Sequence, residues 1–478
     1  MPCTERPRLA VTREAEVRHP TPPWTPNSGA RREQQAGCRC FGFLWGQAGR
    51  SSLQRSALVE AVAQLTRALD QIATLPSTPA LRREQINLQV ALITPLMHFK
   101  GLAAPESHKA VERARLLIEQ AEARGEPPED PLLLFSVLYG FCIANLVAFN
   151  GDLLRELAGQ FLSLAEKQGT TVPLMIGHRL MGLQLGYTGN IAEARTHYDQ
   201  SLALYDAIEH RPLATRFGHD TRVAVLVYRS LTQCCLGYPE AAVADAQQAL
   251  HDAREIGLAH TLLFAEFQAS LTHIHCGNYE VASTLANEIA ALADEKGTVW
   301  FQAGAMCLQG ISAVTGRAPD AVKMINSGIT AWQATGAKLF VPLLLSSSGE
   351  AHAGLSQFDD AQRCIDEAIV ASEATKERWN AVELQRISGE LALKSPERDA
   401  SKAEAYFERA LAVARQQQAK SWELRASMSL ARLWRDQGKV QQARELLAPV
   451  YGWFTEGFDT RDLKEAKALL EELAVTPL

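Results

Sequence analysis

The sequence lacks the motifs that mark most enzymes. It contains no Gly-x-x-x-x-Gly-Lys-Ser/Thr phosphate loop, no Gly-x-Gly-x-x-Gly after a strand, no His-Glu-x-x-His and no Gly-x-Ser-x-Gly. These absences argue against nucleotide-binding, zinc-peptidase and serine-hydrolase chemistry. We therefore expect a protein that is not an enzyme, with no catalytic residue, no cofactor and no metal site.

The spacing of the cysteines indicates neither a disulfide framework nor a metal site. The nine cysteines are scattered, odd in number and without metal-ligand spacing, which argues for reduced structural thiols. Cys234 and Cys235 are adjacent in a helical segment, where neighbouring residues point to different faces. The nearest metal-like set is His273, His275 and Cys276. Only His273 and Cys276 share a helix face, and two ligands do not make a zinc site.

Neither sign of charge dominates the chain. The formal net charge is −6 and the pI is near 6.1, which gives no overall bias toward nucleic acid or an anionic membrane surface. The basic residues between positions 409 and 444 are interleaved with glutamate and aspartate, a pattern typical of solvated helix faces. We expect no nucleic-acid partner. Because no signal-peptide core is visible, we expect a cytoplasmic location.

Long hydrophobic runs are rare, with one exception. Residues 132–149 are 18 consecutive uncharged residues, and such a helix would be about 27 Å long, close to the thickness of a bilayer core. Ser136, Gly140 and Asn145 interrupt the run, which also falls where the repeat described below requires a buried helix. The sequence therefore predicts a buried helix and no membrane partner.

Residues 1–50 differ from the rest of the chain. They contain eight arginines but no lysine and no aspartate, and they show many prolines and no apolar periodicity. This composition predicts a disordered leader. A basic arm that binds nucleic acid is the less favoured alternative. The segment Gly46-Gln-Ala-Gly49 lacks the Gly-Lys-Ser/Thr of a phosphate loop, so no phosphate site is assigned to it.

The rest of the chain is organised around a repeated unit, seen best from Ser346 to Ala371. One helix ends there, a tight turn follows at residues 354–357, and a second helix carries Ala361, Ile365 and Ala368 on one stripe. Small residues on that stripe let two helices approach closely. This is the pattern of a tetratricopeptide-like helical hairpin.

Equivalent residues recur at a nearly constant interval. From Ala114 onward the intervals are 40, 40, 48, 40, 39, 40, 42 and 40 residues. This period of about 40 residues, with no β-type alternation, predicts an all-α fold: a right-handed α-solenoid of tetratricopeptide-like hairpins. The residues that open each second-helix stripe are Ala61, Ala114, Leu154, Ala194, Ala242, Ala282, Ala321, Ala361, Ala403 and Ala443.

The 48-residue interval marks an insertion between Asp206 and Thr221. An insertion in a solenoid often maps to a functional face, and this one could hold an acidic ligand or clamp a neighbouring domain. A packed surface loop is the preferred interpretation. The charged and titratable residues of the insertion are His210, Arg211, Arg216 and His219.

These patterns divide the chain into three parts. Residues 1–50 form the leader, residues 51–459 form the helical-repeat solenoid, and residues 460–478 form a C-terminal capping helix and tail. The capping helix is expected from Arg461 to about Leu473, because a stack of hairpins needs an amphipathic helix to cover its exposed end.

The C-terminal part of the chain resembles one family. The segments that carry the resemblance are Ser421-Trp-Glu-Leu-Arg-Ala-Ser-Met-Ser-Leu-Ala-Arg-Leu-Trp434 and Leu447-Ala-Pro-Val-Tyr-Gly-Trp-Phe-Thr-Glu-Gly-Phe-Asp-Thr460. They are similar to the helical-repeat region of bacterial signalling proteins in which a class III adenylate/guanylate cyclase domain precedes an AAA-like ATPase. The resemblance covers about residues 50–473, and the last forty residues are its most specific part.

The resemblance implies a sensor or scaffold. In the family, the cyclase metal aspartates and the phosphate loop would lie upstream, so no catalytic residue is carried over to this chain. We expect the chain to be the sensor end of such a protein, standing alone through truncation or because its start lies within a longer reading frame. The expected partners are a protein or peptide on the concave face and upstream cyclase/ATPase domains.

Two alternatives remain open. One is a nucleotide-dependent signalling enzyme, a cyclase or ATPase, whose catalytic domains are missing from this chain. The other is a transcription regulator of the ATPase-plus-repeat type.

Overall fold

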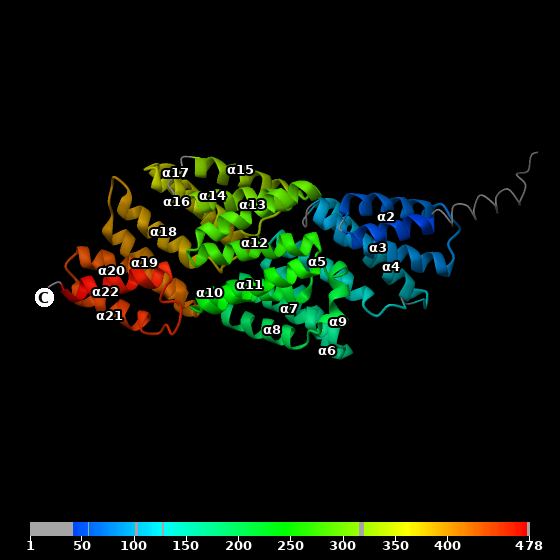
Figure 1. Ribbon diagram of the computed structural model, residues 1–478, viewed down its shortest axis with the longest axis horizontal. Coiled ribbons are helices and arrows are strands. Elements are labelled where there is room, and N and C mark those ends of the chain that lie inside the picture. Colours follow the sequence, from blue (N-terminus) through cyan, green and yellow to red (C-terminus); the bar gives the residue numbers. More distant parts are fainter. Residues whose placement is uncertain (1–41, 56, 101–103, 127–128, 315–319, 476–478) are drawn as a thin grey trace, which may run out of the picture.

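The computed structural model describes residues 42–55, 57–100, 104–126, 129–314 and 320–475 (Figure 1). Within these ranges all regular secondary structure is helical and no strand occurs. The first helices of the hairpins are α3 (Pro79–Lys100), α5 (Leu133–Val147), α7 (Thr171–Tyr187), α10 (Thr221–Leu236), α12 (Ala259–His275), α14 (Val299–Val314), α16 (Val341–Gly354), α18 (Ala381–Lys394) and α20 (Lys420–Asp436).

Each first helix is followed by a second helix that packs against it. The predicted turn at residues 354–357 separates α16 from α17. The second helices are α4 (Pro105–Ala123), α6 (Gly151–Gln168), α8 (Ile191–Ala203), α11 (Pro239–Ile256), α13 (Tyr279–Lys296), α15 (Asp320–Ala334), α17 (Phe358–Thr375), α19 (Ala400–Gln416) and α21 (Val440–Tyr451); α2 (Leu58–Ala73) is the second helix of a further hairpin.

The predicted repeat register is confirmed. All ten marker residues, from Ala61 to Ala443, lie on second helices and are at most 1% exposed. Their small side chains leave room for the neighbouring first helix, and longer residues one turn further along each stripe fill the groove between the helices. The fold is therefore the predicted right-handed α-solenoid of tetratricopeptide-like hairpins with a C-terminal capping helix, α22 (Arg461–Val475).

The helical region begins before the expected boundary at residue 51. Residues 42–54 are helical and form the first helix of the α2 hairpin, whereas residues 1–41 of the expected leader lie outside the described residues. Gly46 and Gly49 explain the difference. A Cβ atom at Gly46 would lie 2.8 Å from Leu88, and one at Gly49 would lie 2.6 Å from Leu65. These glycines, which interrupt the helical pattern in the sequence, permit close packing of helices.

The stack of hairpins winds so tightly that its successive turns touch. The backbone N–H of Lys338, before α16, donates to the carbonyl of Val147 at the end of α5 (2.8 Å), and the N–H of Arg378, before α18, donates to the carbonyl of Tyr187 at the end of α7 (2.9 Å). The Ser421 hydroxyl in α20 likewise donates to the carbonyl of Cys234 in α10 (2.6 Å), 187 residues earlier. In all three cases the second partner lies five hairpins after the first.

The contact between turns buries the inner helices on every side. In α12, 15 of the 17 residues are buried, whereas in its partner α13 only five of 18 are buried. Aromatic rings fill the space between turns: Tyr187 makes edge contacts with Phe340 (5.5 Å between centroids) and Trp379 (6.3 Å). Figure 1 shows the consequence, with α10 next to the C-terminal helices and in contact with α20, although four hairpins intervene along the chain.

The long uncharged run at residues 132–149 forms a buried inner helix, as predicted. Residues 133–147 are α5, which packs between α4, α6 and α3. None of the helices described in the structure is both long enough and apolar enough to cross a membrane.

One buried carboxyl group lies where two turns meet. The Glu377 side chain, only 2% exposed, accepts hydrogen bonds from the Phe340 N–H (3.1 Å) and from the Trp379 indole N–H (2.8 Å). Burial raises the pKa of Glu377 to about 8, because the two donors compensate only part of the lost hydration of the charged form.

This pKa predicts a specific pH dependence of stability. Between pH 5 and pH 8 the unfolded chain releases the Glu377 proton while the folded protein still holds it, so the stability contributed by this carboxyl group falls as the pH rises. We expect the free energy of unfolding of wild type, measured by urea titration relative to Glu377→Gln, to fall over this range. The exposed Glu373→Gln should follow wild type at every pH, and parallel profiles for all three proteins would contradict the assignment.

Candidate functional site

A large open cavity lies at the C-terminal end of the superhelix. Helix α22 follows α12 by five hairpins, as in the other contacts between turns. Its Arg461 donates to the Tyr279 hydroxyl just after the end of α12 (3.2 Å). In the described part of the chain no helix stands five hairpins after α14, α16 or α18, so no later turn covers the ends of these helices. They border a groove of about 600 Å³, which we call the end groove.

The end groove is strongly polar, with equal numbers of acidic and basic side chains. Apolar side chains of Val314, Ile387, Leu391 and Met428 form part of its wall. The cationic residues are Arg386, Lys394, Arg425, Arg432 and Arg461, and the acidic residues are Glu350, Glu383, Glu390, Asp462 and Glu465.

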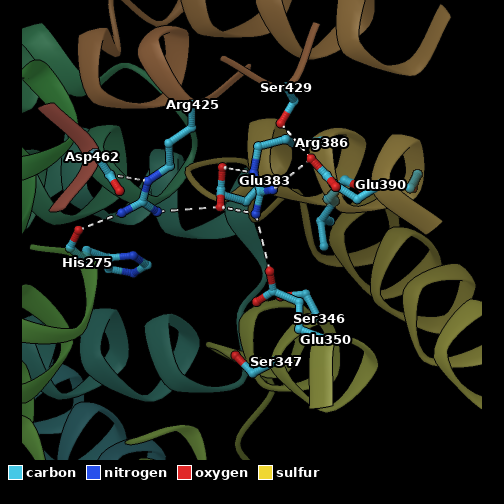
Figure 2. Close-up of polar contacts among 12 residues, drawn as sticks. His275, Ser346, Ser347, Glu350, Glu383, Arg386, Glu390, Arg425, Ser429 and Asp462 are labelled. Atoms are coloured by element: carbon cyan, nitrogen blue, oxygen red, sulfur yellow. Dashed lines mark hydrogen bonds and ion pairs between the residues drawn. The ribbon is translucent and has the colours of Figure 1, made fainter. Parts of the chain in front are cut away.

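Arg425 is the central side chain of the end groove (Figure 2). Its guanidinium group donates to the carbonyl of His275 at the end of α12 (2.7 Å), to the Asp462 carboxylate in α22 (2.5 Å) and to Glu383 in α18 (3.5 Å). Its side chain is 11% exposed and lies over the Trp422 ring at 4.8 Å. One residue therefore joins four segments of the protein: α12, α18, α20 and α22.

A second arginine extends the network toward the rim. Arg386 donates to Glu383 (2.9 Å) and to Glu350 in α16 (3.2 Å), and Ser429 donates to Glu390 (2.8 Å), as Figure 2 shows. Burial alone would raise the pKa of Glu383, but Arg386 and Arg425 outweigh it and hold that pKa at about 2. The network is therefore ionised at neutral pH.

The rim of the end groove carries charges that reach solvent. Lys394 is 58% exposed, and the ion pair between Arg432 and Glu465 (2.8 Å) has both side chains about 40% exposed. These groups can exchange their present partners for those of a ligand at modest cost, because exposed ion pairs contribute little to stability.

The side chains of His273, His275 and Cys276 do not point toward a common centre. His273 contacts Asn278, with 3.4 Å between their side-chain nitrogens, while the His275 ring packs at right angles to Trp379. Cys276 turns instead toward Cys234, with 3.5 Å between the sulfur atoms. Burial and the Arg425 charge lower the pKa of His275 to about 3, so its ring is neutral.

Sequence reasoning missed one cluster of possible ligands, His251, Asp252 and Glu255 on α11. Its members are already engaged: Asp252 accepts from Arg222, and His251 lies 3.4 Å from Glu255. Spacing of i, i+1 and i+4 on a helix is common on solvated surfaces, and this cluster offers no further feature of a metal site.

The inserted segment forms the short helices α9 (Ala207–His210) and η1 (Arg211–Thr215). Its four candidate residues face different partners. Arg216 pairs with Asp130, Arg211 with Glu255 (3.8 Å), His210 accepts from the Asp206 N–H (2.8 Å), and the His219 ring stacks on Phe264 (4.0 Å). The insertion is a packed loop without a common binding centre.

The basic residues of the C-terminal third are largely paired, two of them with interleaved acids and three with acids of α22. The pairs are Arg415–Glu423, Arg425–Asp462, Arg432–Glu465, Arg435–Glu472 and Lys439–Glu404. The expectation of a solvated outer face holds for most of this stretch but not for Arg425, which is buried.

Comparison with known proteins identifies the architecture. No family model matches the sequence, and no curated protein matches it. The structure is similar to a Rap protein crystallised in complex with competence and sporulation factor, with a TM-score of 0.53 and 14% identity over 82% of this chain and 99% of that chain. At this sequence identity the similarity shows the fold alone, which is that of a helical-repeat solenoid.

Two further structures are more distant. One is the apo form of the quorum sensor NprR from B. thuringiensis, with a TM-score of 0.45 and 14% identity over 77% of this chain and 98% of that chain. The other is a signal transduction ATPase with a tetratricopeptide repeat sensor from Pyrococcus horikoshii, with a TM-score of 0.37 and 10% identity over 87% of this chain and 69% of that chain.

The position of Arg425 predicts a large stability effect. Arg425→Met keeps most of the side-chain volume but leaves Glu383 and Asp462 without a central cation. Removing one partner of a buried ion pair typically costs about 3–5 kcal/mol, and we expect a loss of this size in urea unfolding. Arg113→Met, at an exposed position of α4, is the control and should change little. Equal unfolding midpoints for the two variants would contradict the central role of Arg425.

Proposed function

We propose that the protein is a non-catalytic scaffold or sensor that binds a peptide or an extended protein segment in the end groove. The observation that carries this proposal is the end groove itself: about 600 Å³ of open space at the C-terminal end of the superhelix, lined by charged residues of both signs. Over the ends of α5, α7 and α10 the inner surface is covered by the next turn of the chain. The expected binding along the whole concave face is therefore restricted in this proposal to its C-terminal end.

The chemistry of the end groove supports a peptide ligand. Paired charges of both signs, with apolar side chains of Ile387, Leu391 and Met428 between them, match an extended chain with mixed side chains better than a single anion or cation. The Rap protein of similar fold was crystallised in complex with a factor, which is consistent with ligand binding by this architecture.

The sequence resemblance extends the proposal to a larger assembly. In the cyclase–ATPase family that the C-terminal segments resemble, occupation of the end groove would be coupled to neighbouring ATPase and cyclase domains. Helix α22 is suited to transmit such a signal, because Asp462 belongs both to the groove wall and to the contact with Arg425.

Selection from a random peptide library tests the binding proposal. Peptides displayed on phage are selected on the immobilised full chain, and the affinities of the selected peptides are measured by fluorescence anisotropy. Exchanging the charges of the Arg432–Glu465 pair (Arg432→Glu with Glu465→Arg) keeps an ion pair but reverses its polarity. We expect binding about tenfold weaker or worse, as for the loss of a charged hydrogen bond.

The matched control exchanges an ion pair of similar exposure on the outer surface. The pair between Arg254 and Glu288 (3.2 Å) joins α11 and α13, and neither residue lines the end groove. Its exchange should leave peptide affinity unchanged. Failure to select any peptide, or equal losses in both exchanged variants, would overturn the proposal.

The size of the native protein tests the coupling to catalytic domains. On an immunoblot of the source organism, an antibody against the solenoid should detect a species much larger than 52.4 kDa if cyclase and ATPase domains belong to the same polypeptide. A single band at 52.4 kDa would contradict that arrangement and leave the scaffold acting as a separate chain.

A further inference from the structure

A second open pocket lies where α8 and the loop between α10 and α11 meet the helices α19 and α20 of the next turn. It has a volume of about 400 Å³. A single water needs about 10–15 Å³ on the same measure, so this pocket has room for a ligand of many atoms. We call it the seam pocket. Its polar and aromatic lining residues are Arg195, Tyr238, Arg415, Gln418, Lys420 and Trp453.

Both turns of the superhelix contribute to the seam pocket. Arg195 comes from α8 in one turn, whereas Arg415 and Lys420 come from α19 and α20 in the next. Gly237, which has a φ of +99°, lets the two turns approach closely: a Cβ atom there would lie 2.6 Å from the Trp453 ring and 2.9 Å from the Lys420 Cβ. Any side chain at this position would displace both residues, so this part of the wall requires glycine.

The charged side chains that line the seam pocket are all cationic. Arg415 and Lys420 share one carboxylate, that of Glu423 (2.9 and 2.7 Å). Arg195 makes no ion pair within the described part of the chain, and its guanidinium group lies over the Tyr238 ring at 5.0 Å. One carboxylate for three cations leaves two positive charges without an acidic partner.

A ligand in the seam pocket can reach the cations. The Arg415 side chain is 55% exposed, and the side chains of Arg195 and Lys420 are half-buried. The Glu423 side chain is only 6% exposed. An entering ligand therefore meets the positive groups, while the acid that they share stays covered.

Two acids on the neighbouring loops are bonded elsewhere. The Glu456 carboxylate accepts hydrogen bonds from the N–H groups of Glu240 and Ala241 (2.9 and 3.1 Å). The Glu240 carboxylate accepts from the N–H of Gly457 (2.7 Å). Neither acid lines the seam pocket, so its positive charge is left for a ligand.

The two uncompensated charges favour a dianionic ligand. A phosphate monoester carries a charge of about −1.5 to −2 at pH 7, whereas a carboxylate carries a single negative charge. The guanidinium groups of Arg195 and Arg415 suit phosphate oxygens, because arginine can donate two parallel N–H bonds to one phosphate. The exposed Gln418 adds an amide N–H donor at the same wall.

The aromatic residues give the seam pocket an apolar side. Trp453 is 36% exposed, and its ring meets the Tyr238 ring edge-on with 5.6 Å between the centroids. The Lys420 ammonium group lies 5.7 Å from the centroid of the Trp453 ring. A phosphate bound to Lys420 would therefore lie beside an exposed indole, and flat aromatic groups stack on such rings.

We propose that the seam pocket binds a phosphate monoester of a flat aromatic group, either a nucleoside monophosphate or an aryl phosphate. Arg195 and Arg415 hold the phosphate from the two turns, Lys420 adds a third cation, and Trp453 stacks on the aromatic group. Because the ligand joins residues of both turns, its binding stabilises the contact between them. The seam pocket shares no lining residue with the end groove, so this proposal is independent of peptide binding there.

Isothermal titration calorimetry of the full-length chain tests the ligand class, in a phosphate-free buffer of low ionic strength where exposed charges are least screened. The probes are adenosine monophosphate and phenyl phosphate. The comparison compounds are phenyl sulfate, which has a similar shape but one negative charge, and inorganic phosphate, which has no ring. We expect both comparison compounds to bind at least tenfold more weakly than the tighter probe. Tighter binding of adenosine monophosphate would identify a nucleotide, tighter binding of phenyl phosphate an aryl phosphate, and equal binding of these two the group that they share.

Substitutions test which residues hold the ligand. Arg195→Gln should weaken binding of the tighter probe at least tenfold, as for the loss of a charged hydrogen bond. Trp453→Leu should reduce the affinity for that probe to the level of inorganic phosphate, whose own affinity should not change. Arg113→Gln, at an exposed position of α4, removes the same charge and is the matched control, with affinity unchanged.

Thermal unfolding separates loss of the site from loss of the fold. Without ligand, Arg195→Gln should unfold at the wild-type midpoint or above it, since Arg195 has no acidic partner to lose. A saturating probe should raise the midpoint of wild type and of Arg113→Gln but not that of Arg195→Gln. If Arg195→Gln unfolds at a lower midpoint, Arg415→Gln replaces it in the binding comparison, with the same loss expected.

Three results would overturn the proposal. They are the absence of binding by both probes, equal affinities for all four compounds, and equal affinities of the arginine variants of the seam pocket and Arg113→Gln. The peptide selection on the end groove can succeed or fail without changing any of them.

Discussion

The structure depends on one repeated constraint: the ends of α5, α7 and α10 each meet the start of the first helix five hairpins later. The backbone pairs of Val147 with Lys338 and of Tyr187 with Arg378, and the side-chain contact of Ser421 with the Cys234 carbonyl, all follow this rule. A solenoid of hairpins in contact only with their neighbours has an open inner surface. Here the contact between turns fills that surface with aromatic side chains.

The location of the end groove follows from the same constraint. Charged groups are costly inside a packed core, and they persist only where they are paired and where water or a ligand can reach them. The end groove satisfies those conditions, because past α12 the covering turn consists of α22. Arg425 and Glu383 lie at this boundary, so the polar network both closes the last contact between turns and lines the groove.

The sequence predicted the local part of this structure well. The spacing of small residues identified the hairpins and their second helices, because the contact of two neighbouring helices requires small side chains at fixed intervals. The winding of the stack has no local signal, since it joins residues such as Cys234 and Ser421 that are 187 positions apart. The same limit applies to Arg425, which stands in a stretch with ordinary mixed charge and whose partners come from other hairpins and from α22.

The five-hairpin register also limits how the gene can change. In an open solenoid, duplication or loss of one repeat alters only the length of the array. In this protein, an added hairpin between α10 and α16 would displace the contacts of Val147 with Lys338, of Tyr187 with Arg378 and of Cys234 with Ser421 by one position. Changes of length are accommodated instead between hairpins, as α9 and η1 show between α8 and α10. The contacts between turns therefore oppose the gain or loss of a whole hairpin in this part of the stack, whereas a connecting loop can change its length.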